Sequence, residues 1–211
     1  MQGDQPETWP ARAGRVIHQG HIVRLREDDL DSPAGEVLTR EYLLHPGSVA
    51  IIALDDNDRI AVVRQYRHAV RMRLVEPPAG LLDVPGEPPL AAAQRELAEE
   101  AGLAADDWRV LADFCCSPGI SNEVARIFLA RGLRHVNRPE GYEAHGEEVD
   151  MGLAWVPLAE VLQGVRDGVV NNAALVLGVT TLHLALIAGG VDQLRPGDAP
   201  WPLRDHVAPV P

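Results

Sequence analysis

Basic residues are in the minority in this chain, which has 19 lysines and arginines together against 31 aspartates and glutamates. The formal net charge is −12 at pH 7, and the sequence pI is about 5.0. Nonspecific nucleic-acid binding needs clustered basic side chains that contact phosphates, so the composition argues against that class of protein. It does not exclude a phosphorylated substrate, because a bound metal ion can supply positive charge.

Cysteine is also scarce, and the two cysteines, Cys115 and Cys116, are adjacent. Neighbouring residues on a strand point to opposite faces, so no structural disulfide is expected between them. Free thiols suit a reducing cytosol, and we therefore expect a cytoplasmic protein. No histidine stands at ligand spacing with the cysteines, so zinc is not indicated.

Long hydrophobic runs are missing as well. The N-terminal residues are polar and acidic, without the apolar stretch of a signal peptide. The most apolar run, residues 173–188, is interrupted by Thr180, Thr181 and His183, so we expect a buried helix rather than a membrane span. With 46% hydrophobic residues in 211, the chain can bury one sizeable core.

Residues 80–103 carry the strongest functional signal in the chain. Pro88 and Pro89 suit the start of a helix, where the missing N–H is no loss, and Gly102 stands where a left-handed helix end is expected. The helix between them has one apolar stripe, formed by Leu90, Ala93, Leu97 and Ala101.

Three carboxylates share one side of this helix, because Glu96, Glu99 and Glu100 are spaced i, i+3 and i+4. Their negative charges repel one another unless a cation lies among them. A hard cation such as Mg²⁺ requires this kind of oxygen cluster. The alternative is a solvated acidic face on which Arg95 and Glu99 form an ordinary i,i+4 surface pair.

The segment resembles the Nudix box, Gly-x5-Glu-x7-Arg-Glu-U-x-Glu-Glu-x-Gly-U, in which U is a bulky aliphatic residue. One position departs, since Leu81 fills the glycine slot and Gly80 stands one residue early. The loop before the helix must then be one residue longer, and Gly86 can absorb that residue because glycine accepts turn dihedrals freely. The positions in register are Glu87, Arg95, Glu96, Leu97, Glu99, Glu100, Gly102 and Leu103.

Other segments resemble the ADP-ribose pyrophosphatase branch of that family. Pro118 follows Gly102 by sixteen residues, and a proline there is typical of the branch. Residues 65–67, 76–80 and 117–123 are also similar to it.

The resemblance implies an α/β fold, namely an α/β/α sandwich with a mixed sheet and an additional N-terminal antiparallel strand element. Strands interspersed with three helices agree with a mixed sheet covered on both faces. We expect the strand element at residues 1–46, the Nudix hydrolase domain at 47–190 and a proline-rich tail at 191–211. Strands are predicted at 21–26, 37–44, 49–54, 59–66, 74–77, 108–116, 124–129 and 153–156, and later helices at 158–166 and 173–188, with residues 1–15 loose and the tail irregular.

Glu96 and Glu100, one turn apart, are the expected metal ligands, with Glu99 beside them as a further ligand or catalytic carboxylate. The resemblance adds the backbone carbonyl of Ala79 as a ligand. It also implies that Arg95 orients a glutamate rather than touching the substrate. The expected ion is Mg²⁺, with Mn²⁺ as the alternative.

A water nucleophile needs a base or a metal to activate it. Residues 138–148 read as a long polar loop, and long loops in compact domains are often functional. The resemblance implies a loop glutamate as base or late metal ligand, and we assign Glu148, with Glu147 as second choice. The alternative is a pair of solvated loop carboxylates.

Substrate contacts come from the resemblance too. Arg67 matches an arginine that grips phosphate, and Glu123 matches a carboxylate that accepts the hydroxyls of the terminal ribose. Arg40 resembles an arginine delivered from the partner subunit of a homodimer that exchanges its N-terminal strands. Each of these residues could instead be a plain surface charge. The same resemblance places Glu76, Pro118 and Gly119 at the substrate.

The implied activity is the magnesium-dependent hydrolysis of ADP-ribose to AMP and ribose 5-phosphate. Two alternatives stay open: a diphosphatase for another nucleoside diphosphate sugar, and a non-catalytic Nudix domain that senses a nucleotide. Loss of the helix glutamates would indicate the second, and all of them are present. Neither a nucleic acid nor a membrane is an expected partner.

Overall fold

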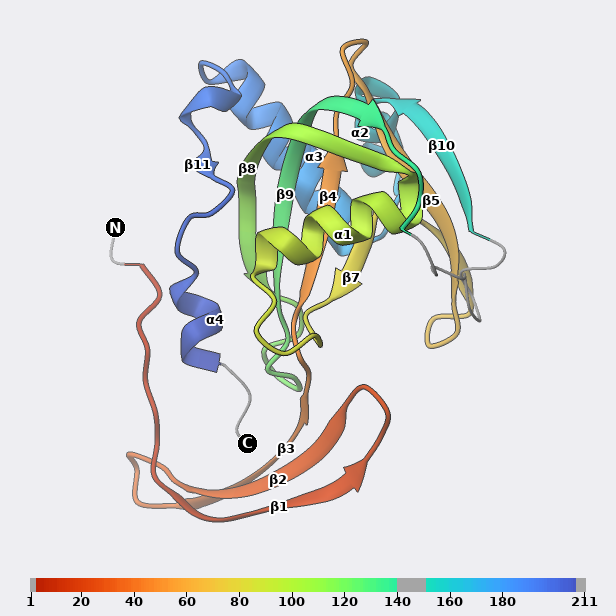
Figure 1. Ribbon diagram of the computed structural model, residues 1–211. Helices are drawn as coiled ribbons and strands as arrows, with labels where there is room; N and C mark the ends of the chain where they lie inside the picture. Colours follow the sequence, from red (N-terminus) through yellow and green to blue (C-terminus); the bar gives the residue numbers. More distant parts are fainter. Residues whose placement is uncertain (1–2, 140–150, 208–211) are drawn as a thin grey trace. The chain divides into compact units, whose positions relative to one another are not determined.

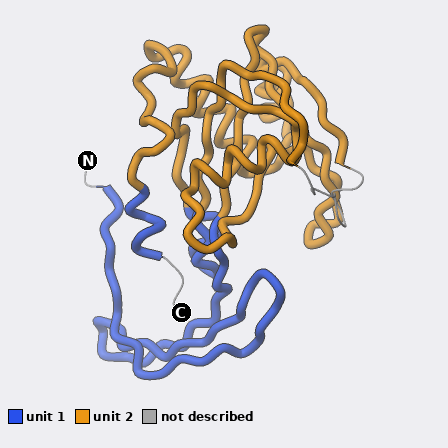
Figure 2. Tube along the Cα trace, viewed as in Figure 1, with its two compact units in different colours: residues 1–47, 115–124, 201–211 blue, residues 48–114, 125–200 orange. Residues whose placement is uncertain are grey.

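The computed structural model describes residues 3–139 and 151–207. Its chain divides into two compact units, which Figure 2 colours separately. The smaller unit holds residues 1–47, 115–124 and 201–211, and the larger unit holds residues 48–114 and 125–200. The two units are described in turn.

A five-stranded mixed sheet forms the centre of the larger unit (Figure 1). Two neighbouring interior strands, β4 (Ser48–Ala53) and β9 (Val124–His135), run parallel, with Ser48 opposite Ala125 and Ala53 opposite Ala130. β7 is antiparallel to β4 on one side. The strands in spatial order are β11 (Arg195–Pro196), β8 (Leu103–Cys115), β9 (Val124–His135), β4 (Ser48–Ala53) and β7 (Ala79–Leu81).

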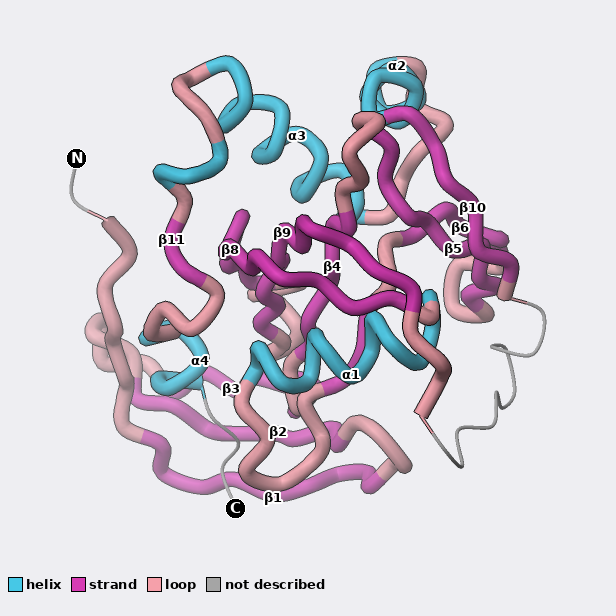
Figure 3. Tube along the Cα trace, turned by 45° about the horizontal axis from the view of Figure 1, so that its top comes forward, coloured by secondary structure: helices cyan, strands magenta, loops and turns pink. Residues whose placement is uncertain are grey.

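Helices cover both faces of this sheet, with α1 (Pro89–Ala101) on one side and α3 (Ala173–Ile187) on the other (Figures 1 and 3). Strands buried on both faces are apolar along their whole length, and β4 is almost entirely buried in this way. Ala50 and Ile52 belong to the core cluster on the α3 side, which also includes Leu175, Val179 and Leu182. The predicted α/β/α sandwich is therefore confirmed.

A second sheet of the larger unit has the order β10 (Gly152–Pro157), β5 (Arg59–Arg67), β6 (Met72–Glu76) and is antiparallel throughout. The turn before β5 is closed by Asp55, whose carboxylate accepts from the backbone N–H of Asn57 and of Arg59. Helix α2 (Leu158–Arg166) follows β10 and buries Leu158 and Val161 in the shared core.

The smaller unit contains an antiparallel sheet of β1 (Ala11–Gln19), β2 (Arg24–Asp31) and β3 (Val37–Leu44). The expectation that residues 1–15 are loose is wrong from Ala11 onward, and the predicted strand at 21–26 begins later. All nine residues of β1 are exposed, so no apolar alternation marks the strand. Cross-strand ion pairs join it to β2 instead, Arg12 with Asp31 and Arg15 with Glu27.

The segment after Gly189 is more regular than the sequence indicated. The short 3₁₀ helix η2 (Val191–Gln193) leads into β11, and α4 (Pro202–Val207) follows it. A proline at the first position of α4 costs no hydrogen bond, which is how a proline-rich segment still starts a helix. Within the described residues, no helix is both long and apolar enough to cross a membrane.

Candidate active site

Helix α1 has the ends that its sequence predicts. Its N-cap is Pro88, and Pro89 is the first helical residue. Gly102 ends the helix in the left-handed conformation, with φ of 62°, and its N–H donates to the carbonyl of Ala98. Leu97 is fully buried and Glu100 is buried too, so the glutamate side of the helix adjoins its apolar stripe.

Arg95 holds three carboxylates together. Its Nη1 donates to Glu96 Oε1 at 2.6 Å and to Glu99 Oε2 at 2.9 Å. Its Nε and Nη2 donate to the two oxygens of Glu87, each at 3.0 Å. The guanidinium therefore offsets the repulsion among the glutamates and fixes the rotamers of all three.

The electrostatics of this cluster follow from those contacts. The hydrogen bond to Arg95 is the main cause that lowers the pKa of Glu87 below its ordinary value. The pKa of Arg95 is in turn raised, first by Glu87 and further by Glu96 and Glu99. Glu87 and Arg95 thus both stay charged across the physiological pH range.

β7 passes directly over the glutamates of α1. The backbone N–H of Ala79 donates to Glu100 Oε2 at 3.0 Å, and Glu100 is buried. A Cβ atom at Gly80 would lie 2.0 Å from the Glu96 carboxyl carbon, so any larger residue would displace the Glu96 side chain. The loop that follows contains Gly86 with φ of 78°, which agrees with the expectation that it absorbs the extra residue.

The donor set around β7 and α1 matches a hard divalent cation in its chemistry. Glu96, Glu99 and Glu100 offer only oxygen ligands, and Gly80 leaves room for the Glu96 carboxylate. Among residues 3–139 and 151–207, no three His, Cys, Asp or Glu side chains are grouped tightly enough to count as a metal site. In this arrangement Arg95 contacts Glu96 and Glu99, and the Ala79 N–H contacts Glu100.

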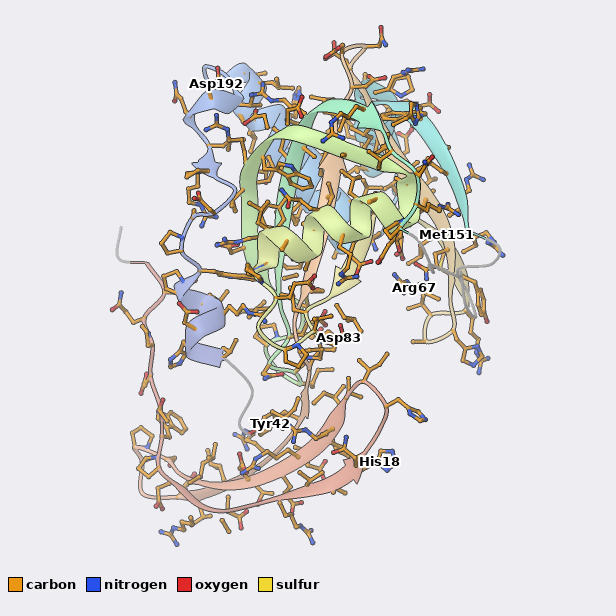
Figure 4. The ribbon with its side chains drawn as sticks, viewed as in Figure 1. His18, Tyr42, Arg67, Asp83, Met151 and Asp192 are labelled. Carbon is orange, nitrogen blue, oxygen red and sulfur yellow. The ribbon has the colours of Figure 1, made fainter. Side chains whose placement is uncertain are left out.

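Arg67 and Glu76 form an ion pair across the β5–β6 hairpin. Arg67 Nη2 lies 2.6 Å from Glu76 Oε2, and Arg67 Nε donates to both oxygens of the same carboxylate. The Glu76 side chain is 3% exposed and that of Arg67 43% exposed. The buried carboxylate therefore orients an accessible guanidinium, which is labelled in Figure 4.

The smaller unit holds the other candidates that the structure describes. Glu123 lies at the end of a turn that includes Pro118 and Gly119, and its carboxylate is 3.8 Å from Nδ1 of His45. Arg40 lies on β3 opposite Asp28, exposed, with Nη1 donating to the Thr39 carbonyl.

The structure thus brings the box residues together in the larger unit and places Glu123, Pro118, Gly119 and Arg40 in the smaller one. Glu147 and Glu148 lie outside the described residues.

Sequence reasoning missed several contacts. The close approach of Gly80 to Glu96 was not predicted, although the position of Gly80, one residue out of register, indicated a special local geometry. The ion pair of Glu76 with Arg67 was not predicted either. Asn122 was missed too: its Oδ1 accepts from the backbone N–H of His45 at 2.8 Å. Those two residues are far apart in sequence, and no local period reveals their pairing.

Comparison with known proteins agrees with this geometry. The family model described as NUDIX domain matches residues 44–175. The ADP-ribose pyrophosphatase of Mycobacterium tuberculosis is 47% identical over 189 residues, which cover 90% of this chain and 89% of that protein. This chain belongs to the NUDIX family.

Other NUDIX relatives support the assignment. The ADP-ribose pyrophosphatase of Bacillus subtilis is 38% identical and covers 82% of this chain and 91% of its own. The methanol dehydrogenase activator of Bacillus methanolicus is 34% identical, and the match covers 80% of this chain and 89% of that protein. The expected relationship to the ADP-ribose pyrophosphatase branch is confirmed by these identities. A crystal structure of an ADP compounds hydrolase, at 23% identity and a TM-score of 0.74, covers 90% of this chain and 100% of that one and shares the fold.

Proposed function

We propose that this NUDIX protein hydrolyses the pyrophosphate bond of ADP-ribose, giving AMP and ribose 5-phosphate, and that the reaction depends on Mg²⁺. The observation that carries the proposal is the joint placement of Glu96, Glu99 and Glu100 on α1, next to the β7 backbone. Two relatives that carry the name ADP-ribose pyrophosphatase, at 47% and 38% identity, support the choice of substrate.

Ala79, Glu96, Glu99 and Glu100 would hold the cation, with Mn²⁺ as a possible replacement. When bound, a divalent ion supplies positive charge against the negative charge that develops on the phosphoryl oxygens. Arg95 keeps the glutamates in place through its contacts with Glu96 and Glu99, as the resemblance implies. Mutation of such outer partners commonly costs about 10- to 100-fold in metal affinity or activity.

The remaining residues bind the substrate or activate water. Glu76 fixes the orientation of Arg67, whose planar guanidinium suits two phosphate oxygens at once. Glu123 would accept the hydroxyls of the terminal ribose, since a carboxylate can accept from both members of a cis-diol. Glu148, or else Glu147, remains the predicted base. The homodimer with an exchanged N-terminal element, and the contact that Arg40 would make from it, also remain predictions.

A second nucleoside diphosphate sugar is the alternative substrate. The relatives include a GDP-mannose pyrophosphatase of Cronobacter sakazakii, 28% identical over 180 residues. The pyrophosphate bond and the metal would be the same in both reactions, so only the pocket for the sugar and base distinguishes them.

The test is product analysis of the purified protein with Mg²⁺ and a panel of ADP-ribose, ADP-glucose, GDP-mannose, NADH and ATP. We expect AMP to appear fastest from ADP-ribose, and EDTA to abolish its release until Mg²⁺ is restored. Faster hydrolysis of another member would move the substrate and keep the reaction. Tight nucleotide binding without any hydrolysis would indicate a sensor instead.

A further inference from the structure

The β5–β6 hairpin is strongly basic, although the chain as a whole is acidic, with a net charge of −12. Strands β10, β5 and β6 lie side by side in one sheet (Figure 3) and contain a single carboxylate, that of Glu76, which Arg67 holds. The stretch at residues 64–73 has no aspartate or glutamate, and its arginines are Arg64, Arg67, Arg71 and Arg73. The strands of this sheet therefore do not balance the positive charge of the hairpin.

Arg71 stands in the turn of the hairpin in a conformation that arginine rarely adopts. Its φ is 54°, and its N–H donates to the His68 carbonyl at 3.1 Å. Left-handed backbone suits glycine or asparagine, because a Cβ atom crowds the following carbonyl. Residues held in such a conformation gather at functional sites. An exposed arginine at this position therefore indicates a use for its charge.

Arg64 and Arg71 present their charges to solvent, since both residues are exposed. Among residues 3–139 and 151–207, neither forms an ion pair with a carboxylate. Arg73 is exposed as well, and its Nη1 donates across the hairpin to the Arg64 carbonyl at 3.4 Å. The field of Arg64 and Arg71 thus extends into the solvent and is not cancelled by a described neighbour.

The ladder of the hairpin separates these arginines from the one that would contact phosphate. Arg67 is opposite Met72, and Tyr66 is opposite Arg73. Side chains alternate along a strand, so Arg64 and Arg73 lie on the face opposite to that of Arg67. The backbones of Arg71 and Arg73, which flank Met72, nevertheless lie within roughly 10 Å of Arg67, which is about one Debye length at 0.1 M salt.

The hairpin leads directly into the proposed metal site. Ala79 follows Glu76 by three residues, which span at most about 10 Å. The glutamates of α1 and the net charge of the chain repel a pyrophosphate dianion as it approaches. A basic surface beside such a site raises the local concentration of an anionic ligand and its rate of association.

We propose that the exposed arginines of the hairpin form a steering surface for the pyrophosphate substrate. The surface consists of Arg64, Arg71 and Arg73, and it draws the anion toward the proposed metal site. These arginines act through their field rather than through contact, so they speed association without entering the chemical step. The inference rests on the proposed function, because it takes the substrate to be a nucleoside diphosphate sugar.

The test combines Arg64→Gln with Arg71→Asn and leaves Arg67 unchanged. Asparagine removes the charge of Arg71 and still accepts left-handed backbone, so the turn is retained. In about 20 mM KCl at fixed Mg²⁺, we expect kcat/KM for ADP-ribose to be about three- to tenfold lower in the double variant than in wild type. The kcat and the Tm should match those of wild type.

Salt gives the readout that a structural role would not move. The Debye length falls from about 10 Å at 0.1 M to about 3 Å at 1 M ionic strength. The deficit in kcat/KM should therefore shrink to less than about twofold in 1 M KCl. A deficit of the same size at every salt concentration would indicate a lost contact or a distorted hairpin, and no deficit at low salt would mean that the arginines do not steer; either result would overturn the inference.

Two single variants serve as controls. Arg166→Gln removes the same charge from an exposed position on α2, where the guanidinium contacts Gln163, and should leave kcat/KM unchanged at every salt concentration. Arg71→Lys keeps the charge in the turn and should retain the wild-type rate. An equal loss in Arg166→Gln would show that net charge alone sets the rate, which contradicts a steering surface on the hairpin.

Charge on β6 has a second physical role that the same variant tests. β6 is an edge strand of its sheet, and charged side chains on an edge prevent pairing with another chain. If that role were the whole explanation, the double variant would associate on size-exclusion chromatography while its kcat/KM per subunit equalled that of wild type in low salt. That combination would overturn the inference.

The proposed function can fail separately. If the panel identifies another nucleoside diphosphate sugar, the same salt-dependent deficit with that compound supports the steering surface. If no compound is turned over, the proposed function fails, and stopped-flow fluorescence with etheno-ADP-ribose decides the inference. Slower association of the double variant in low salt, with an unchanged dissociation rate constant, supports it, whereas equal association rates or the absence of binding overturn it.

Discussion

The two carboxylate clusters of this protein differ in the partner that holds them. On α1, a guanidinium binds Glu87, Glu96 and Glu99. In the smaller unit, Glu123 faces an imidazole and a thiol. Arginine stays protonated at any pH that a protein encounters, whereas histidine changes charge near neutrality. The first cluster should therefore keep its charges at neutral pH and in mild acid, whereas the group beside Glu123 can change charge in that range.

The clusters also differ in how the chain assembles them. The first draws on residues 79–100, a strand, a loop and one helix, so helical periodicity sets most of its geometry. The second needs β3 and the turn at residues 117–123 to meet, and only long-range pairing achieves that. The proposed metal site is thus built locally, whereas the proposed ribose contact at Glu123 is built from distant segments.

The largest effect is expected from Glu100→Gln. Glutamine keeps an oxygen that can accept the Ala79 N–H, but it removes the negative charge that a cation needs. Metal stabilisation is worth several kcal/mol, so kcat should fall roughly 100-fold or more. Steady-state kinetics with ADP-ribose measures this loss, and circular dichroism checks that the fold is retained.

Glu160→Gln is the matched control, because Glu160 is an exposed carboxylate on α2. It removes the same charge and should leave kcat unchanged. Full turnover in folded Glu100→Gln would refute the metal assignment and remove the contrast between the two clusters.

An intermediate effect is expected from Gly80→Ala. The new Cβ would come within 2.0 Å of the Glu96 carboxyl group, so that side chain must move. Overpacking of this kind costs about 1–3 kcal/mol of stability, and misplacing a ligand by about 1 Å can cost roughly 100-fold in rate. Chemical denaturation and kcat report the two effects separately.

Gly152→Ala serves as its control, since a Cβ there meets nothing within 4 Å. That variant should match wild type in both measurements. Wild-type activity in Gly80→Ala would mean that Glu96 can leave its place beside β7 without consequence.

The sequence predicted α1, its caps and the shared face of its glutamates, because all of these depend on spacing within one helix. It did not predict β1, whose residues are exposed on both faces, or that Glu100 is buried beneath the Ala79 backbone. The contacts of His45 with Asn122 and Glu123 were equally out of reach. They arise from tertiary pairing, which leaves no periodic signal in a single chain.

The smallest effect tests the constancy of the first cluster, through the pH dependence of Glu87→Gln. Because Arg95 lowers the pKa of Glu87 in the folded protein, the pair contributes stability above the ordinary value of 4.5 and loses it as pH falls through the folded pKa. A partly exposed pair of this kind is worth at most about 1 kcal/mol. The difference in unfolding free energy between wild type and Glu87→Gln, measured in urea, should be constant above about pH 5.5 and shrink below about pH 4.5. A difference that instead changed near neutrality, well above the range in which Glu87 titrates, would mean that another titrating group acts on this cluster.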